Sequence, residues 1–112
     1  MRIWYRVSDL DAARAFYRDT LGLTETFVDQ GERWASFERG VTEIVIGEAA
    51  EERADADGPV ATIDVEDVKS ERERLAAVGV EVGTVLELHG AMRLLDVFDP
   101  DGNRIQLAED LA

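Results

Sequence analysis

The chain of 112 residues has no cysteine, which excludes disulfide bonds, thiolate metal sites and cysteine nucleophiles. The glycine-rich phosphate loops GxGxxG and GxxxxGK do not occur, and neither does the GxSxG turn of serine hydrolases. Nothing therefore predicts a nucleotide cofactor held by such a loop. Histidine occurs once, as His89, so a histidine-rich site cannot be built. His89 precedes Gly90 between two predicted strands, where it is either a general base or, as we favour, an exposed turn residue.

Basic residues are few, because 12 lysines and arginines stand against 25 acidic residues and give a formal net charge of -13. Repulsion between this charge and phosphate groups argues against a nucleic-acid partner. No apolar run reaches transmembrane length, and Met1 precedes a strand-like segment rather than a secretion signal. We therefore expect a cytoplasmic protein without a membrane partner. The length predicts one domain that buries roughly 65% of its unfolded surface.

The first module, residues 1–48, reads as a strand, a helix and three further strands. Residues 2–7 alternate between an apolar and a polar face, and an amphipathic helix follows from a cap at Ser8 or Asp9 to Gly22. Strand-like segments then cover 23–29, 33–38 and 42–47, with turns between them. The charged segment 49–58 is predicted to be an exposed linker.

The same plan restarts in the second module, residues 59–112. A strand is predicted at 60–65, a helix at 68–78, and strands at 80–87, 91–98 and 104–108. This duplication predicts a single α+β domain of two βαβββ modules, which form a curled mixed sheet around a cleft. Exposed strand edges lead us to expect a homodimer. The order of the elements does not decide whether the modules pair within a chain or are swapped between chains.

Two segments, RVSDLDAARAFYRDTLGL at 6–23 and DVFDPDGNRIQLAE at 96–109, carry a family resemblance. Together they resemble the vicinal oxygen chelate superfamily, which includes glyoxalase I, extradiol dioxygenases, bleomycin-resistance proteins and fosfomycin-resistance enzymes. The resemblance covers essentially the whole chain and implies the same paired-module fold. One motif encodes a capped helix and the other a hairpin, so both build the fold and neither selects one function of the superfamily.

The resemblance also implies where the metal-using members bind their ion. Four positions on the inner strands, two in each module, align here with Arg2, Gly47, Val60 and Gln106. A guanidinium group, a glycine and a valine offer no ligand atom, and one neutral amide oxygen holds a divalent cation poorly. We therefore predict no metal and no other cofactor. A divalent metal is the alternative if the strand register differs, with oxygens then supplied by Glu43, Glu48, Glu87, Glu109 and Gln106.

The inner strands offer a mixed set of side chains that would suit a small organic molecule. If Gln106 faces inward, strand alternation predicts these ligand-binding residues: Arg2, Trp4, Arg6, Thr62, Asp64, Met92, Arg104 and Gln106. An indole would stack on a planar ligand, and an arginine would bind an anionic group in a bidentate manner. Plain packing is the alternative for Trp4 and the favoured role for Trp34, and a salt bridge with Asp64 is the alternative for Arg6.

These observations favour a small-molecule-binding protein of the glyoxalase, bleomycin resistance and dioxygenase type, with an anionic or aromatic ligand and no catalytic metal. The alternative is a metal-dependent lyase, isomerase or dioxygenase acting on a substrate with vicinal oxygens. A metal-free enzyme with Asp64 or Glu87 as its base and a purely structural or regulatory dimer are also open. The sequence assigns no catalytic residue and leaves open whether the protein is an enzyme.

Overall fold

The computed structural model describes residues 2–48 and 60–111, and the predicted linker 49–58 lies outside them. The first module contains β1 (Arg2–Val7), α1 (Leu10–Ala15), η1 (Phe16–Thr20), β2 (Thr24–Asp29), β3 (Trp34–Arg39) and β4 (Thr42–Glu48). The second contains β5 (Ala61–Asp64), α2 (Val68–Ala77), β6 (Glu81–Val82), β7 (Leu86–Leu88), β8 (Met92–Phe98) and β9 (Arg104–Asp110). No helix in the described ranges is long and apolar enough to cross a membrane.

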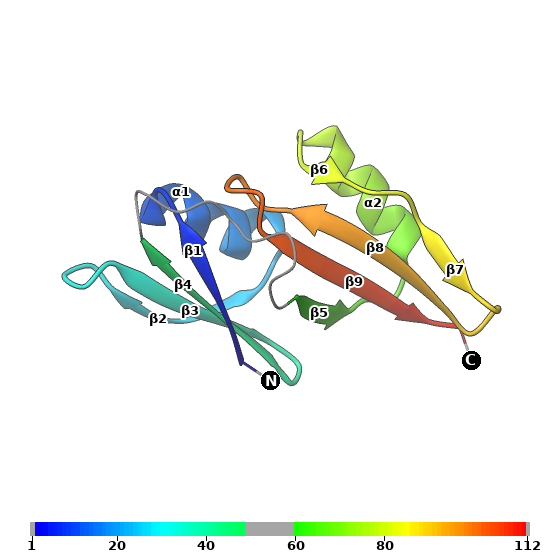
Figure 1. Ribbon diagram of the computed structural model, residues 1–112, viewed down its shortest axis with the longest axis horizontal. Helices are drawn as coiled ribbons and strands as arrows, with labels where there is room; N and C mark the ends of the chain where they lie inside the picture. Colours follow the sequence, from blue (N-terminus) through cyan, green and yellow to red (C-terminus); the bar gives the residue numbers. More distant parts are fainter. Residues whose placement is uncertain (1, 49–59, 112) are drawn as a thin grey trace.

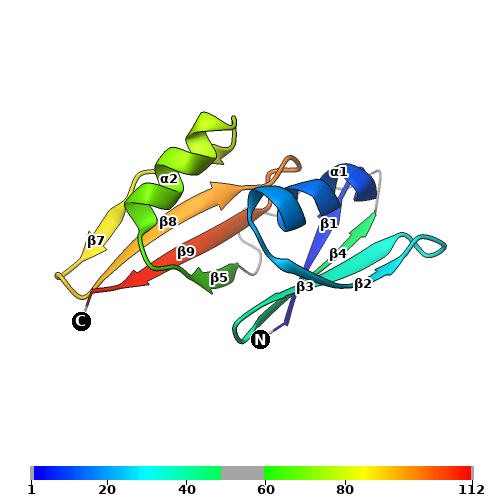
Figure 2. The same ribbon diagram turned by 180° about the vertical axis from the view of Figure 1, so that it is seen from behind.

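Each module forms its own sheet, and the two sheets have the same topology. The strand order is β1-β4-β3-β2 in the first sheet and β5-β9-β8-β6 in the second, where β7 also pairs with β8. β1 runs parallel to β4, β5 runs parallel to β9, and the other neighbours are antiparallel. Figures 1 and 2 show the modules side by side, with α1 and α2 along the same edge of the molecule. The predicted fold of paired βαβββ modules is confirmed.

Both helices begin at the aspartates that the sequence predicts as caps. The Asp9 carboxylate accepts hydrogen bonds from the backbone N–H groups of Asp11, at 3.0 Å, and Ala12, at 3.2 Å. The Asp67 carboxylate accepts one from the Ser70 N–H at 3.1 Å. These bonds satisfy donors that the first turn of a helix leaves without an intrahelical partner. Both aspartates therefore have a structural role.

Two predicted elements differ in the structure. The first helix is α-helical only to Ala15 and continues as the π-helix η1, where the Leu21 N–H bonds to the Phe16 carbonyl over five residues at 2.8 Å. The strand predicted at 80–87 is instead two short strands, β6 and β7. One extra residue lies opposite β8 between them, because Val82 pairs with Val97 whereas Leu86 pairs with Leu94. This bulge interrupts the strand at residues 83–85.

One hydrophobic core joins the modules within the single chain. Its cluster of buried residues contains members of both modules, among them Val7 and Phe37 from the first and Leu75 and Leu107 from the second. Tyr17 lies fully buried at the centre, with ring centroids 5.2 Å from Phe16, 5.7 Å from Phe37 and 6.4 Å from Tyr5. The described modules therefore pair with each other within the chain.

Two tyrosines of the first module reach polar groups of the second. The Tyr17 hydroxyl donates to Asp99 Oδ2 at 2.8 Å, and the Tyr5 hydroxyl donates to the Arg104 carbonyl at 2.6 Å. The Tyr5 oxygen also accepts from the Ala61 N–H at 2.9 Å. Burial raises the pKa of Tyr17 well above its ordinary value and also raises the pKa of Asp99. Tyr17 therefore stays a protonated donor at neutral pH.

Candidate functional site

The face of each sheet that lies opposite its helix, here called the open face, carries all eight predicted ligand-binding residues. On β1 the side chains of Tyr5 and Val7 are buried in the core, so the alternate positions point the other way. On β9 the same alternation buries Ile105 and Leu107. Arg2, Trp4 and Arg6 thus lie on the open face of the first sheet. The other five lie on the second sheet: Thr62, Asp64, Met92, Arg104 and Gln106.

The structure brings together some of these eight residues and separates others. Trp4 and Arg6 line one cavity of about 700 Å³ with Tyr5, Gly47 and Glu48, and the other six predicted residues are not in its lining. On the second sheet Thr62 is level with Gln106, the two residues being direct neighbours on β5 and β9. The first sheet therefore holds the candidate site, and the second offers a separate polar pair.

Three aromatic side chains form a row on the open face of the first sheet. The ring centroid of Trp34 lies 6.5 Å from that of Trp4 and 4.8 Å from that of Phe27. Trp4 is 63% exposed and Phe27 is 49% exposed, whereas large aromatic side chains are usually covered. This aromatic row, Phe27–Trp34–Trp4, presents ring surface that a planar molecule would cover. Trp34, which the sequence favours as a plain packing residue, is the ring that joins the other two.

Sequence reasoning missed Phe27 because of a bulge in β2. Simple alternation from the buried Leu23 places Phe27 on the helix side of the sheet. The register between β2 and β3 shifts between Glu25 and Phe27, so that Phe27 pairs with Ser36 and shares its face. A single extra residue thus moves this ring from the core side to the open face. The sequence carries no glycine or proline there that would have signalled the bulge.

Gly47 leaves space beside the aromatic row. In the sheet register Gly47 lies between Arg6 on β1 and Trp34 on β3. A Cβ atom added at Gly47 would meet no atom within 4 Å. The absence of a side chain therefore keeps the cavity open between the guanidinium-bearing strand and the indole of Trp34.

Arginines on the open faces differ in how they are engaged. Arg2 forms an ion pair with Glu43, its neighbour in the register of β1 and β4. Arg104 lies 3.8 Å from Asp96 on the adjacent strand β8. The Arg6 carbonyl accepts a hydrogen bond of 2.8 Å from the Asn103 amide, which fixes the β1 backbone against the second module. Arg6 is the arginine whose position coincides with the cavity.

The register changes the positions at which the family resemblance would place a metal. Gly47 was expected beside Arg2, and this is wrong: Glu43 is level with Arg2, while Gly47 is level with Arg6, four residues further along β1. Val60 directly precedes β5, and Gln106 is level with Thr62. Four residues per strand correspond to about 13 Å, so Arg2 and Gly47 cannot share one ion.

Carboxylates proposed as alternative metal ligands are bound to arginines instead. Glu48 Oε2 lies 2.8 Å from Arg33, and Glu87 Oε1 lies 3.1 Å from Arg93. Glu109 Oε2 lies 3.5 Å from Arg93, and Glu43 pairs with Arg2. Within residues 2–48 and 60–111, no three histidine, cysteine, aspartate or glutamate side chains are grouped so as to hold a metal ion. The donor set does not fit the metal site of the superfamily's enzymes.

Glu48 and Glu109 have a shared structural role that the sequence did not reveal. Glu48 Oε2 accepts from the Leu10 N–H, and Glu109 Oε1 accepts from the Val68 N–H, both at 2.9 Å. Each carboxylate comes from the last strand of its module and meets the N-terminus of that module's helix, where negative charge is favoured. The hydrogen bond from Arg33 lowers the pKa of Glu48 below its ordinary value, and the bond from Leu10 adds to this effect.

His89 occupies the turn between β7 and β8. It is exposed and has a backbone φ of +52°, and the Ala91 N–H bonds to the Leu88 carbonyl across the turn at 2.8 Å. The favoured interpretation, an exposed turn residue, is confirmed. Nothing in this geometry brings the imidazole to the cavity that Trp4 and Arg6 line.

The family model for the Glyoxalase/Bleomycin resistance protein/Dioxygenase superfamily matches residues 2–107. The chain belongs to this superfamily. Its structure is similar to that of a lactoylglutathione lyase from Agrobacterium tumefaciens, with a TM-score of 0.75, 25% identity, and 97% of this chain and 91% of that chain covered. No curated protein matches the chain.

Two further solved structures of the superfamily have the same fold at lower identity. A bleomycin resistance determinant encoded on transposon Tn5 matches with a TM-score of 0.78 and 18% identity, over 100% of this chain and 98% of that one. A fosfomycin resistance protein from Listeria monocytogenes matches with a TM-score of 0.79 and 20% identity, over 97% and 90%. At these identities the likeness shows the fold alone, so function has to be argued from the residues.

Proposed function

We propose that the protein binds a small, planar organic molecule with an anionic group on the open face of its first module, without a metal held by the protein. The observation that carries this proposal is the aromatic row Phe27–Trp34–Trp4 next to Arg6, around a cavity of about 700 Å³. Ligand sites in proteins commonly have volumes of about 300–1,000 Å³, with apolar walls and a few polar groups. The ligand would be an aromatic carboxylate or a similar anion.

The chemistry of the lining supports this ligand class. Offset stacking on Trp4 or Trp34 would cover a flat ring, and the open position at Gly47 would admit it. Arg6 would bind an anionic substituent through its planar fork of N–H donors. The formal net charge of -13 repels anions at a distance, so this local cation has to provide the attraction.

The comparisons agree with a binding function but do not select it. Two of the similar structures bear names of resistance to bleomycin and fosfomycin, and one is named as a lactoylglutathione lyase. We take from them that this fold accommodates small organic molecules. A metal-dependent lyase, isomerase or dioxygenase is the alternative function, and the arginine-bound carboxylates argue against it.

The proposal includes a homodimer in the cytoplasm, with no nucleic acid or membrane as partner. The half-exposed Phe27 lies on β2, which is the outer strand of its sheet, and Trp4 is more exposed still. A second copy that approached this face would cover the ligand and these rings together. Sedimentation equilibrium tests the dimer, and a monomer at all concentrations would remove this part of the proposal.

Elemental mass spectrometry is the first test. The protein is purified without chelator, exposed to nickel, manganese, iron and zinc ions, and dialysed. We expect far less than one ion per chain to be retained. A stoichiometric metal would contradict the proposal and support the metal-dependent enzyme, and Glu43, Glu48, Glu87 and Glu109 would then be replaced one at a time.

Ligand binding is tested by the fluorescence of the two tryptophans. Both Trp4 and Trp34 lie in the aromatic row, so a ligand that stacks there quenches most of the emission. A panel of aromatic carboxylates is titrated together with neutral analogues of the same ring systems. We expect saturable quenching by an anion, lost in Arg6→Ala and weakened in Trp4→Ala. Saturation by the neutral analogues alone would contradict the anionic ligand.

A further inference from the structure

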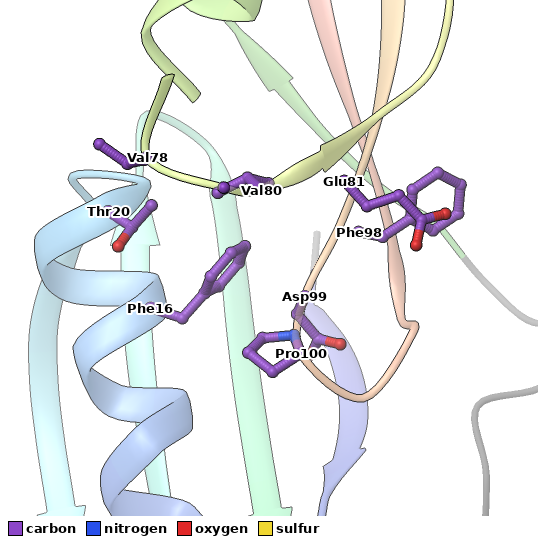
Figure 3. A pocket seen from close by; sticks show the side chains of 9 residues that line it. Phe16, Thr20, Val78, Val80, Glu81, Phe98, Asp99 and Pro100 are labelled. Atoms are coloured by element: carbon purple, nitrogen blue, oxygen red, sulfur yellow. The ribbon is translucent and has the colours of Figure 1, made fainter. Parts of the chain in front are cut away.

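A second cavity lies at the seam between the modules and shares no lining residue with the open-face cavity. Its volume is about 360 Å³, and these residues line it: Phe16, Thr20, Val78, Gly79, Val80, Glu81, Phe98, Asp99 and Pro100. Figure 3 shows the Phe16 ring pointing toward Val80, with Thr20 and Val78 at one end of the view and Asp99 and Pro100 at the other. One wall comes from η1 and the other from the second module. We call it the seam cavity.

Hydrogen bonds across the seam hold both walls in place. The Tyr17 hydroxyl bonds to Asp99 Oδ2 at 2.8 Å on one side of the cavity. An arginine of α2, Arg74, donates to the Thr20 carbonyl at 2.7 Å and ties the end of η1 to the second module. The Val80 N–H bonds to the Leu75 carbonyl at 3.0 Å and fixes the loop after α2. The cavity is therefore formed before any ligand arrives, which lowers the ordering cost of binding.

The π-helical turn contributes directly to the seam cavity. Phe16 and Thr20 are the first and last residues of η1, and both line the cavity. π-helical turns are rare in proteins and are frequent at functional sites, because their wide hydrogen-bonded loop is retained at a cost in stability. In this chain the wide turn ends at the residue whose carbonyl Arg74 binds. The irregular helix and the cavity thus coincide.

The polar groups of the lining decide which ligand charge it accepts. Both Asp99 oxygens already accept hydrogen bonds, from Asp101 N–H and Asn103 on one side and from Tyr17 and Asn103 on the other. Glu81 is exposed, and no cation in the described ranges pairs with it. The rest of the wall is largely apolar. A ligand with an apolar ring and a cationic head would satisfy both features.

We propose that the seam cavity is a second binding site, for a small organic amine whose ring packs between Phe16 and Val80 and whose ammonium group pairs with Glu81. A single six-membered ring with a short aminoalkyl arm has a size that suits about 360 Å³. The two cavities then select opposite charges, an anion at Arg6 and a cation at Glu81. This site does not depend on the function proposed for the open face.

The test is a titration of the ¹⁵N-labelled full chain with benzylamine, benzyl alcohol and benzoate, followed by two-dimensional NMR. We expect benzylamine to shift the backbone amides of residues 16, 20, 78–81 and 98 and to saturate, and benzoate to leave them unshifted. Benzyl alcohol should bind the same residues more weakly. Glu81→Gln should weaken benzylamine about three- to fivefold, the scale of one exposed ion pair, without changing benzyl alcohol.

Matched variants separate this site from general attraction of cations to an acidic protein. Glu73→Gln removes the same charge from the exposed side of α2, away from the cavity, and should leave benzylamine binding unchanged. Val78→Trp, at a side chain that is 65% exposed, should fill the cavity and abolish binding of both neutral and cationic probes. Equal losses in Glu73→Gln and Glu81→Gln would overturn the proposal. Shifts without saturation, or binding to Val78→Trp as to the wild type, would also overturn it.

Discussion

The Tyr17 hydroxyl donates a 2.8 Å hydrogen bond to Asp99 Oδ2, and this bond joins the helix of the first module to the hairpin of the second. Both residues are buried. Asp99 also accepts from the Asn103 amide, which in turn donates to the Arg6 carbonyl. The two motifs that resemble the superfamily therefore meet in one network. This network fixes the strand that carries Arg6 relative to the second module.

Removing the Tyr17 hydroxyl should weaken the junction between the modules. Tyr17→Phe keeps the ring packing but leaves a buried Asp99 oxygen with one donor fewer, and we expect a loss of about 1–3 kcal/mol in the free energy of unfolding. Urea denaturation followed by circular dichroism measures it. Thr84→Val removes an exposed hydroxyl and should change stability by less than about 0.5 kcal/mol. Equal stability of Tyr17→Phe and wild type would show that the bond contributes nothing.

The Arg33–Glu48 pair should make stability depend on pH in the acid range. Because the hydrogen bond from Arg33 lowers the pKa of Glu48 below 4.5, the pair stabilises the fold above that pH and loses its effect as the pH falls through the folded-state pKa. Urea unfolding between pH 3 and pH 7 should show a shallower acid loss in Glu48→Gln than in the wild type. Glu73→Gln should follow the wild type, and a wild-type slope in Glu48→Gln would contradict this role.

Much of the fold could be predicted because the local signals agree with the tertiary structure. Asp9 and Asp67 cap their helices as expected, and the apolar faces predicted for both helices are the buried ones. The internal duplication specified the order of the elements. Glu48 and Glu109 escaped notice because their partners, Leu10 and Val68, lie far away in the sequence. A side chain that caps a helix from another strand leaves no periodic signal.

The candidate site was less predictable than the fold. Trp4 and Arg6 were found by strand alternation, which holds along β1. Phe27 was not, because one extra residue in β2 reverses the face on which it lies. The seam cavity depends on a π-helical turn that the spacing of apolar residues does not distinguish from an α-helix. Irregularities of one residue thus decide which side chains reach a site.

Phe27 should contribute to ligand affinity although the sequence did not predict it. Phe27→Ala removes the ring that lies 4.8 Å from Trp34, and we expect affinity for an aromatic anion to fall about three- to tenfold. Tryptophan fluorescence titration measures this, since Trp4 and Trp34 both remain. Leu86→Ala removes an exposed apolar side chain from the other module and should leave affinity unchanged. An unchanged affinity in Phe27→Ala would remove this ring from the site.

Filling the space at Gly47 should abolish ligand binding without harming the fold. Gly47 is in the middle of three strands, between Arg6 and Trp34, and an added Cβ atom meets nothing within 4 Å. Gly47→Leu should therefore keep or raise the melting temperature, because glycine is unfavourable inside a strand, while its side chain occupies the cavity. Fluorescence titration and thermal unfolding are measured on the same samples. Thr24→Val, an exposed strand substitution in the same sheet, should change neither binding nor stability appreciably. Wild-type affinity in a folded Gly47→Leu variant would place the ligand elsewhere on the molecule.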